Sequence, residues 1–292
     1  MKSDGWKLAE VILKAVNDKD IAKGDGNYYP RTSAIGRCPR DATMHAYDEP
    51  WSDPPESMWG QQLRFDMGHD AEVRVIDAME IAGITVCCQQ MTVEIETPMG
   101  LKVTGHMDGV IVIPHDMPHG GKWYVMDVKS AGPYMYRKIY DEQESKGNIT
   151  NRQQISIYAE SVINDEKFPD LNGNKVSDLL FEGYEYGGGM LAYIAIDRPT
   201  KGYGPKKVDY PKLHLCQFEI ESFDVEMYLD KFDDVQIHLD ENTLPGIPHS
   251  SDEAIWGGIR CSPRWCRRYS VCQSITEPQS KKLREVLLSL KQ

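Results

Sequence analysis

The segment "KWYVMDVKSAG", residues 122–132, constrains the fold of this 292-residue chain more than any other. Its aromatic and β-branched residues are typical of a strand that is covered by the rest of the protein. Because side chains alternate along a strand, Asp127 and Lys129 must lie on one face, and Met126 and Val128 on the other. An acid and a base side by side in so apolar a strand indicate a special role for that face.

The rest of the chain alternates between helical and strand-like patterns. Helices are expected at residues 6–17, 57–82, 133–144, 150–164, 223–239 and 278–290. Strands are expected at residues 84–97, 101–113, 122–130, 178–186, 190–198 and 212–221. Gly83 is expected to end the first long helix. This order predicts an α/β domain with a central mixed β-sheet flanked by helices.

Composition and charge narrow the class of protein. No apolar run reaches the ~18 residues of a membrane helix, and the N-terminus is too polar for a secretion signal, so a cytoplasmic location is expected. The net charge of −12 argues against a uniformly basic surface for nucleic acid. Residues 256–292 nevertheless carry +6 and the remaining residues −18. This basic tail fits either a local contact with a phosphate backbone or a solvated helix.

Three acids have the spacing of a metal site. Asp108 lies in the strand before Asp127, and adjacent antiparallel strands would bring both carboxylates within reach of one metal ion. Glu72 follows Gly68 by four residues on the helix 57–82, so the two share a face that is expected to approach a sheet or a ligand. Such an oxygen-rich site suits Mg²⁺ or Mn²⁺. With Lys129 beside it, the arrangement is typical of metal-assisted phosphodiester hydrolysis.

A fourth motif follows on the helix 150–164, where Gln154 and Tyr158 lie four residues apart on one face. In this order the motifs Gly-x-x-x-Glu, Gly-x-x-Asp-Gly, Asp-x-Lys and Gln-x-x-x-Tyr resemble those of the PD-(D/E)XK nuclease superfamily, in its RecB-like exonuclease branch. The resemblance implies a restriction-endonuclease-like core and a metal-dependent DNA exonuclease.

The resemblance also implies a role for each motif residue. The implied metal ligands are Glu72, Asp108, Asp127 and the backbone carbonyl of Val128. Lys129 would orient a water molecule or stabilise charge, and Gln154 and Tyr158 would support the site and contact DNA. Many RecB-like members have His where Glu72 stands, so His69, one turn away, is an alternative ligand.

The cysteines form a second candidate site. Seven cysteines, an odd number in a chain with no secretion signal, disfavour a disulfide framework. Cys38 precedes the acidic motifs, whereas Cys261, Cys266 and Cys272 follow them within twelve residues. Four thiolates complete either a zinc or an iron–sulfur site, and spacing alone leaves the metal open.

One cysteine before the acidic motifs and three after them resemble the iron-staple nucleases, which include CRISPR-associated exonucleases and the AddB nuclease domain. The resemblance implies a 4Fe-4S cluster that ties the two ends of the chain together, so that its loss destabilises the fold. The expected organisation is one compact domain made of a helical segment with the first cysteine (1–55), a nuclease core (56–245) and a cysteine-rich segment with a basic helix (246–292).

The expected function is that of a Mg²⁺- or Mn²⁺-dependent deoxyribonuclease. Its substrate would be single-stranded DNA or the ends of double-stranded DNA. Without a phosphate-binding helicase motif it would act alone or with a recombination or CRISPR-adaptation protein, in a host cytoplasm if phage-encoded. The alternative is a non-catalytic DNA-binding or inhibitory protein that retains the fold; the complete set of acids and lysine argues against it. A monomer and a ring are both compatible with the sequence.

Overall fold

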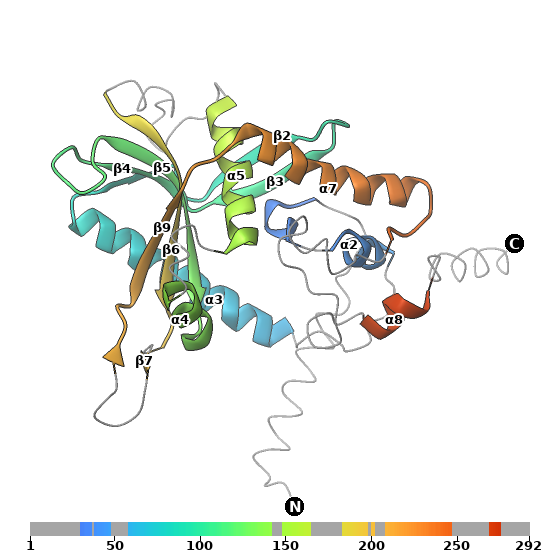
Figure 1. Ribbon diagram of the computed structural model, residues 1–292, viewed down its shortest axis with the longest axis horizontal. Coiled ribbons are helices and arrows are strands. Elements are labelled where there is room, and N and C mark those ends of the chain that lie inside the picture. The colour runs from blue at the N-terminus through green and yellow to red at the C-terminus, as the bar shows by residue number, and fades with distance from the viewer. Residues whose placement is uncertain are drawn as a thin grey trace, which may run out of the picture.

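A mixed five-stranded sheet forms the centre of the part of the chain that the structure describes (Figure 1). This computed structural model describes residues 30–36, 38–47, 58–141, 148–164, 183–197, 200–201, 208–246 and 269–275. The strand order is β1 (Thr85–Cys87), β4 (Gly109–Ile113), β5 (Lys122–Ala131), β6 (Glu185–Ala195) and β9 (Leu213–Phe218). β5 and β6 are parallel and the other neighbours are antiparallel, so the predicted mixed sheet is confirmed.

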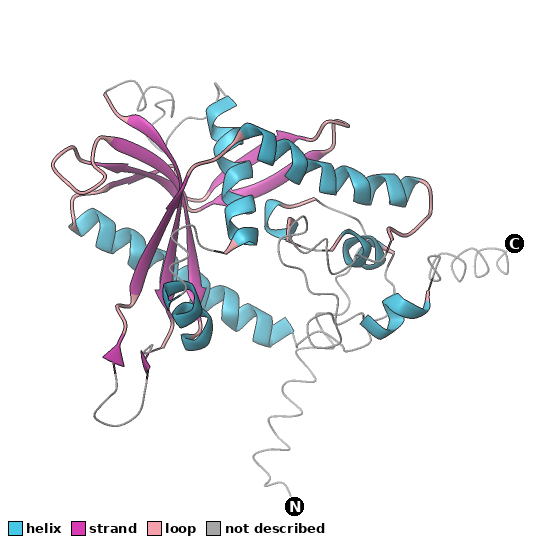
Figure 2. Cartoon of the chain, in the orientation of Figure 1, coloured by secondary structure: helices cyan, strands magenta, loops and turns pink. Residues whose placement is uncertain are grey.

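Helices cover both faces of this sheet (Figure 2). α3 (Met58–Ile81) packs on one face, while α4 (Pro133–Asp141) and α5 (Ile149–Asn164) pack on the other. α7 (Ser222–Asp240) packs on α5, and α2 (Pro39–Ala46) packs on α7. No helix among the described residues is long and apolar enough to cross a membrane.

The remaining elements are short. They are the 3-10 helix η2 (Thr32–Ala34), the hairpin β2 (Met91–Glu96) and β3 (Lys102–Met107), the pair β7 (Thr200–Lys201) and β8 (Val208–Asp209), and the helix α8 (Tyr269–Ser274). The two helices expected at 6–17 and 278–290 lie outside the described residues.

Strand β5 is fixed in place by apolar contacts on both faces. Trp123, Val125 and Ala131 belong to the core cluster that includes α5, whereas Tyr124 and Met126 belong to the cluster that includes α3. Burying a side chain of this size contributes about 1.5–3 kcal/mol. Apolar contacts on both faces therefore fix the position of the strand. Because side chains alternate along it, Asp127 and Lys129 lie on the face of the sheet that α5 covers.

The expected strand 101–113 is divided at Asp108 into β3 and β4, which belong to different sheets. Asp108 is not part of either ladder, and its Oδ2 accepts a hydrogen bond from the Val128 N–H at 2.6 Å. The next residue, Gly109, is tightly packed, because an added Cβ would lie 3.1 Å from the Cys87 carbonyl oxygen. The division places Asp108 at the junction of the two sheets.

The two strands expected at 178–186 and 190–198 are one strand where the structure describes them, β6. The "GGG" at 187–189 is typical of a turn but here serves close packing. An added Cβ would lie 2.3 Å from the Tyr124 ring at Gly187 and 2.6 Å from the Phe218 ring at Gly189. The aromatic neighbours fill the space of the missing side chains, so the prediction of a break was wrong.

Helix α3 ends as the sequence predicts. Gly83 has a φ of +85°, which favours glycine, and the Ile84 N–H bonds to the Met79 carbonyl beyond it. Gly68 behaves differently from the expectation. An added Cβ there would meet no described atom within 4 Å, so this glycine does not bring α3 close to the sheet. Among the described residues, nothing packs against this position.

A buried carboxylate on α7 anchors the turn between β2 and β3. Asp233 accepts hydrogen bonds from the Thr97 hydroxyl and, at 3.1 Å, from the Met99 N–H. Both Asp233 and Thr97 are at most 5% exposed. The hairpin is therefore held against α7 by an acid whose donors lie more than a hundred residues away in sequence.

Replacing Asp233 by Ala is expected to lower the free energy of unfolding by about 2–3 kcal/mol, because two donors lose a charged acceptor. Urea unfolding followed by circular dichroism measures this loss. Asp234→Ala is the matched control, since Asp234 is partly exposed and faces His238 at 3.7 Å, and it should cost less than about 1 kcal/mol. Equal losses in the two variants would show that Asp233 is not an anchor.

Candidate functional site

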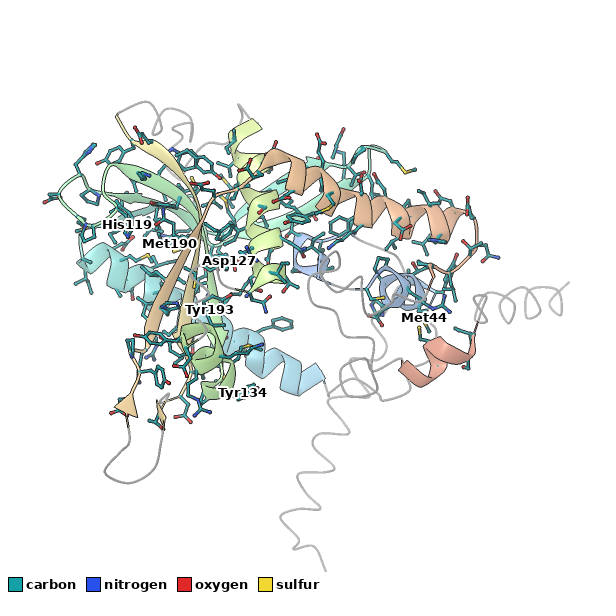
Figure 3. All side chains as sticks on the ribbon, viewed as in Figure 1. Met44, His119, Asp127, Tyr134, Met190 and Tyr193 are labelled. Atoms are coloured by element: carbon teal, nitrogen blue, oxygen red, sulfur yellow. The ribbon has the colours of Figure 1, made fainter. Side chains whose placement is uncertain are left out.

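The acid and base of β5 form an ion pair beside α5, where Figure 3 labels Asp127. Asp127 is 2% exposed, and its Oδ2 lies 2.6 Å from the Lys129 Nζ, whose side chain is 27% exposed. The contact is a charge-assisted hydrogen bond from the Lys129 ammonium to the Asp127 carboxylate. Oδ2 of Asp127 is thus buried next to the Lys129 ammonium, and its second lone pair can accept a further donor or bind a cation.

Both members of the pair have shifted pKa values. Burial raises the pKa of Asp127 above its ordinary value, although the Lys129 charge opposes the shift. Burial also works against the Lys129 ammonium, but the negative charges of Asp127 and Asp108 outweigh it and raise the pKa of Lys129. The ammonium is therefore kept charged inside a cluster of acids.

Asp108 lies close to this pair, as the register of β4 and β5 requires. Gly109 is paired with Met126, so Asp108 is level with Asp127 on the neighbouring strand. Burial and the negative charge of Asp127 raise the pKa of Asp108 to about 8, and Glu72 adds to the shift. The Val128 N–H bond to Asp108 opposes it without cancelling it.

Glu72 reaches Asp108 from α3 through a residue that the sequence did not single out. The Gln90 amide donates a hydrogen bond to Glu72 Oε1, and the same Nε2 lies 3.5 Å from Asp108 Oδ1. On its other side Glu72 Oε2 lies 3.5 Å from the Nδ1 of His69. Glu72 is only 8% exposed. The alternative ligand His69 is therefore adjacent to Glu72, and its side chain is mostly exposed.

The pair Gln154 and Tyr158 extends the site along α5. Lys129 Nζ donates to Gln154 Oε1 at 3.2 Å, and Gln154 Nε2 donates to the Tyr158 hydroxyl at 2.6 Å. Thr32 in η2 also donates to that hydroxyl, at 3.0 Å. Gly105 permits this contact, because an added Cβ would lie 2.1 Å from the Thr32 hydroxyl oxygen. This series of hydrogen-bonded side chains, which runs from Lys129 to Thr32, holds the lysine in place from the α5 side.

The acids are close but are engaged by donors of the protein itself. Among the described residues, no three His, Cys, Asp or Glu side chains are arranged as a ready metal site. Lys129 faces Asp127, Val128 N–H faces Asp108, and Gln90 faces Glu72. Burial raises the pKa of both aspartates, and the negative charge of Asp127 adds to the shift at Asp108; a divalent cation beside them would stabilise their ionised forms. The donor chemistry therefore fits Mg²⁺ or Mn²⁺.

The two described members of the cysteine group lie near each other. Cys38 precedes α2 as its N-cap, and Cys272 lies in α8. Burial raises the pKa of the Cys38 thiol to about 12; the backbone N–H groups of Asp41 and Arg40 oppose the shift, and Cys272 adds to it. A thiol held neutral in this way needs the positive charge of a metal or cluster to become a thiolate ligand. Cys38 and Cys272 are two of the four cysteines that the sequence pattern groups together.

Arg40 joins the segments that carry these cysteines. It is 4% exposed, and its Nε donates to Cys272 Sγ at 3.1 Å. Its Nη groups donate to the backbone carbonyls of Pro245, Cys272 and Ile275. The buried guanidinium therefore binds α8 and the end of the α7 segment to α2. Cys261, Cys266 and the four arginines 260, 264, 267 and 268 lie outside the described residues.

Three residues of these two sites were missed by sequence reasoning. Gln90 and Thr32 carry no motif, and their contacts span 18 and 126 residues. Arg40 lies two residues after Cys38, in "CPR", but nothing in the sequence indicates that it is buried. In the turn "PHDMPHGG" (residues 114–121), which joins β4 to β5, the side chains of His115, Asp116 and His119 are exposed.

Comparison with known proteins adds little to this geometry. The sequence matches no protein-family model and no curated protein. Among solved structures the chain is similar to SSO0001, known from a crystal structure. The TM-score is 0.37 and the identity 14%, over 79% of this chain and 86% of that chain. A likeness at this level carries no argument about fold family or function.

Proposed function

We propose that the chain is a metal-dependent DNA exonuclease of the PD-(D/E)XK superfamily, in its RecB-like branch. The observation that carries the proposal is the grouping of Asp108, Asp127 and Lys129 at one junction of two sheets. The hydrogen-bonded pair Gln154 and Tyr158 extends from it. The motifs that suggest the superfamily lie far apart in sequence, and in space they meet at one place.

Each group of residues in this site has its own role in the proposed hydrolysis of a phosphodiester bond. A cation held by Glu72, Asp108, Asp127 and the Val128 carbonyl would polarise the phosphorus–oxygen bond under attack. Lys129 is charged and partly exposed, so it either orients the attacking water or stabilises negative charge on the phosphate. Gln154 holds the lysine in place and hydrogen-bonds to Tyr158, which is 1% exposed and therefore supports the site from within rather than contacting DNA as expected.

The cysteine group belongs to the same proposal. Cys38 and Cys272, together with Cys261 and Cys266, would hold a 4Fe-4S cluster that fastens both ends of the chain to the nuclease core. The proximity of the first two cysteines supports this, as does the buried Arg40 that donates to Cys272. As-purified protein is expected to be brown and to contain about four iron atoms per chain. A colourless protein with stoichiometric zinc would replace the cluster by a structural zinc site.

A non-catalytic DNA-binding or inhibitory protein is the second candidate. The observation in its favour is that Gln90 and Lys129 themselves engage the carboxylates of Glu72 and Asp127. The grouping of three acids and a lysine, two of the acids buried, favours the enzyme, because DNA binding does not require that arrangement.

An assay of purified protein on end-labelled DNA separates the two candidates. Single- and double-stranded substrates with either the 5′ or the 3′ end blocked are incubated with Mg²⁺, Mn²⁺ or EDTA. The exonuclease proposal predicts labelled mono- or short oligonucleotides with either metal and none with EDTA. Tight DNA binding without any cleavage would support the non-catalytic alternative. The blocked ends also report the direction of digestion and the preferred strand form.

A further inference from the structure

The loop between β1 and β2 carries an unusual backbone conformation next to the acids. Gln90 has a φ of +53° and Cys88 a φ of +56°, although neither is glycine. The left-handed region costs an ordinary residue roughly 1 kcal/mol and persists where the surrounding structure fixes it. Cys88 is 1% exposed and belongs to the core, whereas Gln90 is exposed. Cys88 therefore anchors the loop in the core, and the loop places the Gln90 side-chain amide beside the acids.

That amide lies between two carboxylates from different elements. Gln90 Nε2 donates to Glu72 Oε1 on α3 and lies 3.5 Å from Asp108 Oδ1 at the sheet junction. The amide hydrogens carry partial positive charge, so they stabilise negative charge on either acid. The neutral amide thus stabilises the two acids weakly, in the place where a cation would stabilise them strongly.

We infer that Gln90 is a positioning residue that occupies the place of the catalytic cation while the site is empty. The inference rests on the proposed metal site. In the metal-free protein the amide keeps Glu72 and Asp108 facing each other. On metal binding it has to release these oxygens, because a donor and a cation compete for the same carboxylate oxygens. Gln90 therefore stabilises the metal-free protein and lowers its affinity for the metal.

Two substitutions withdraw the amide from the two carboxylates and suit the backbone conformation of residue 90. Gln90→Asn keeps an amide on a side chain one methylene shorter, and Asn tolerates a positive φ. Gln90→Gly removes the side chain and suits the same φ. Gln89→Asn shortens the adjacent glutamine, which has no assigned place in the site, and serves as the matched control.

The experiment is isothermal titration of Mn²⁺ into the full-length wild type and the three variants, with melting temperatures measured in EDTA and at saturating Mn²⁺. Both Gln90 variants should bind Mn²⁺ at least ~5-fold more tightly than wild type, because one hydrogen bond to a charged group is no longer lost on binding. Both should melt ~2–4 °C lower in EDTA and at the wild-type temperature in saturating Mn²⁺. Gln89→Asn should match wild type throughout.

The outcomes separate this inference from the proposed function. If wild type binds Mn²⁺ and the Gln90 variants bind it equally or more weakly, the placeholder role is wrong and the metal site stands. A purely structural Gln90 would lower the melting temperature in EDTA and in Mn²⁺ alike, which also overturns the inference. If wild type shows no Mn²⁺ binding at all, the metal site and the placeholder role fail together.

Discussion

Replacing Lys129 by Met should reduce metal-dependent DNA cleavage at least ~10³-fold, since one group supplies both orientation and charge stabilisation. Lys129 Nζ contacts Asp127 Oδ2 at 2.6 Å and Gln154 Oε1 at 3.2 Å. Methionine keeps the unbranched stem but has neither charge nor donors. Asp127, whose pKa burial already raises, would then take up a proton rather than remain an unpaired buried charge.

The rate of release of labelled nucleotides from DNA in Mn²⁺ measures this loss. Lys102→Met is the matched control, because Lys102 also pairs with a carboxylate, Glu94, at 2.7 Å. Lys102 lies on β3 at the surface, so its variant should retain wild-type activity. Circular dichroism of both variants should match wild type. An active Lys129→Met protein would remove the lysine from the mechanism.

Replacing Arg40 by Met should produce the largest loss of stability, about 3–5 kcal/mol in the free energy of unfolding. The 4%-exposed guanidinium donates to three backbone carbonyls and to the sulfur of Cys272. Methionine fills part of the volume but leaves all four acceptors without this donor. These acceptors belong to the segment after α7 and to α8, which Arg40 joins to α2. Without the guanidinium, α8 should detach from α2, and the iron or zinc content should fall together with the stability.

Urea unfolding of the as-purified full chain, with metal analysis of the same samples, tests this prediction. Arg137→Met is a suitable control: Arg137 also donates to two carbonyls, those of Pro133 and Thr200, but is only half-buried. Its loss should cost about 1 kcal/mol or less and leave the metal content unchanged. If the Arg40 and Arg137 variants lose equal stability, Arg40 does not hold the cysteine segment.

The elements that were predicted well are those whose signals are local. Strand β5 and helix α3 follow from alternation, helical periodicity and a glycine stop, all contained within the elements themselves. The meeting of Asp108, Asp127 and Lys129 was also expected, because two successive strands of this length pair antiparallel. The same holds for Gln154 and Tyr158, which lie one helical turn apart.

The features that could not be predicted depend on contacts between distant segments. Gly187 and Gly189 are typical of a turn, yet the rings of Tyr124 and Phe218 occupy their side-chain space in a continuous strand. Asp108 interrupts a strand because it bonds to the Val128 N–H on its neighbour. The contacts of Gln90 and Arg40 depend on how loops and helices are placed once the core has formed, which no periodicity encodes.

The most direct test of the acidic site is the cleavage rate of end-labelled DNA in Mn²⁺ by wild type and by Asp127→Asn, purified side by side. Asparagine preserves the size of a side chain that is 2% exposed but removes the charge that pairs with Lys129. The account predicts metal-dependent cleavage by wild type and at least ~10³-fold slower cleavage by the variant. Equal rates in the two proteins, or no cleavage by wild type, would contradict it.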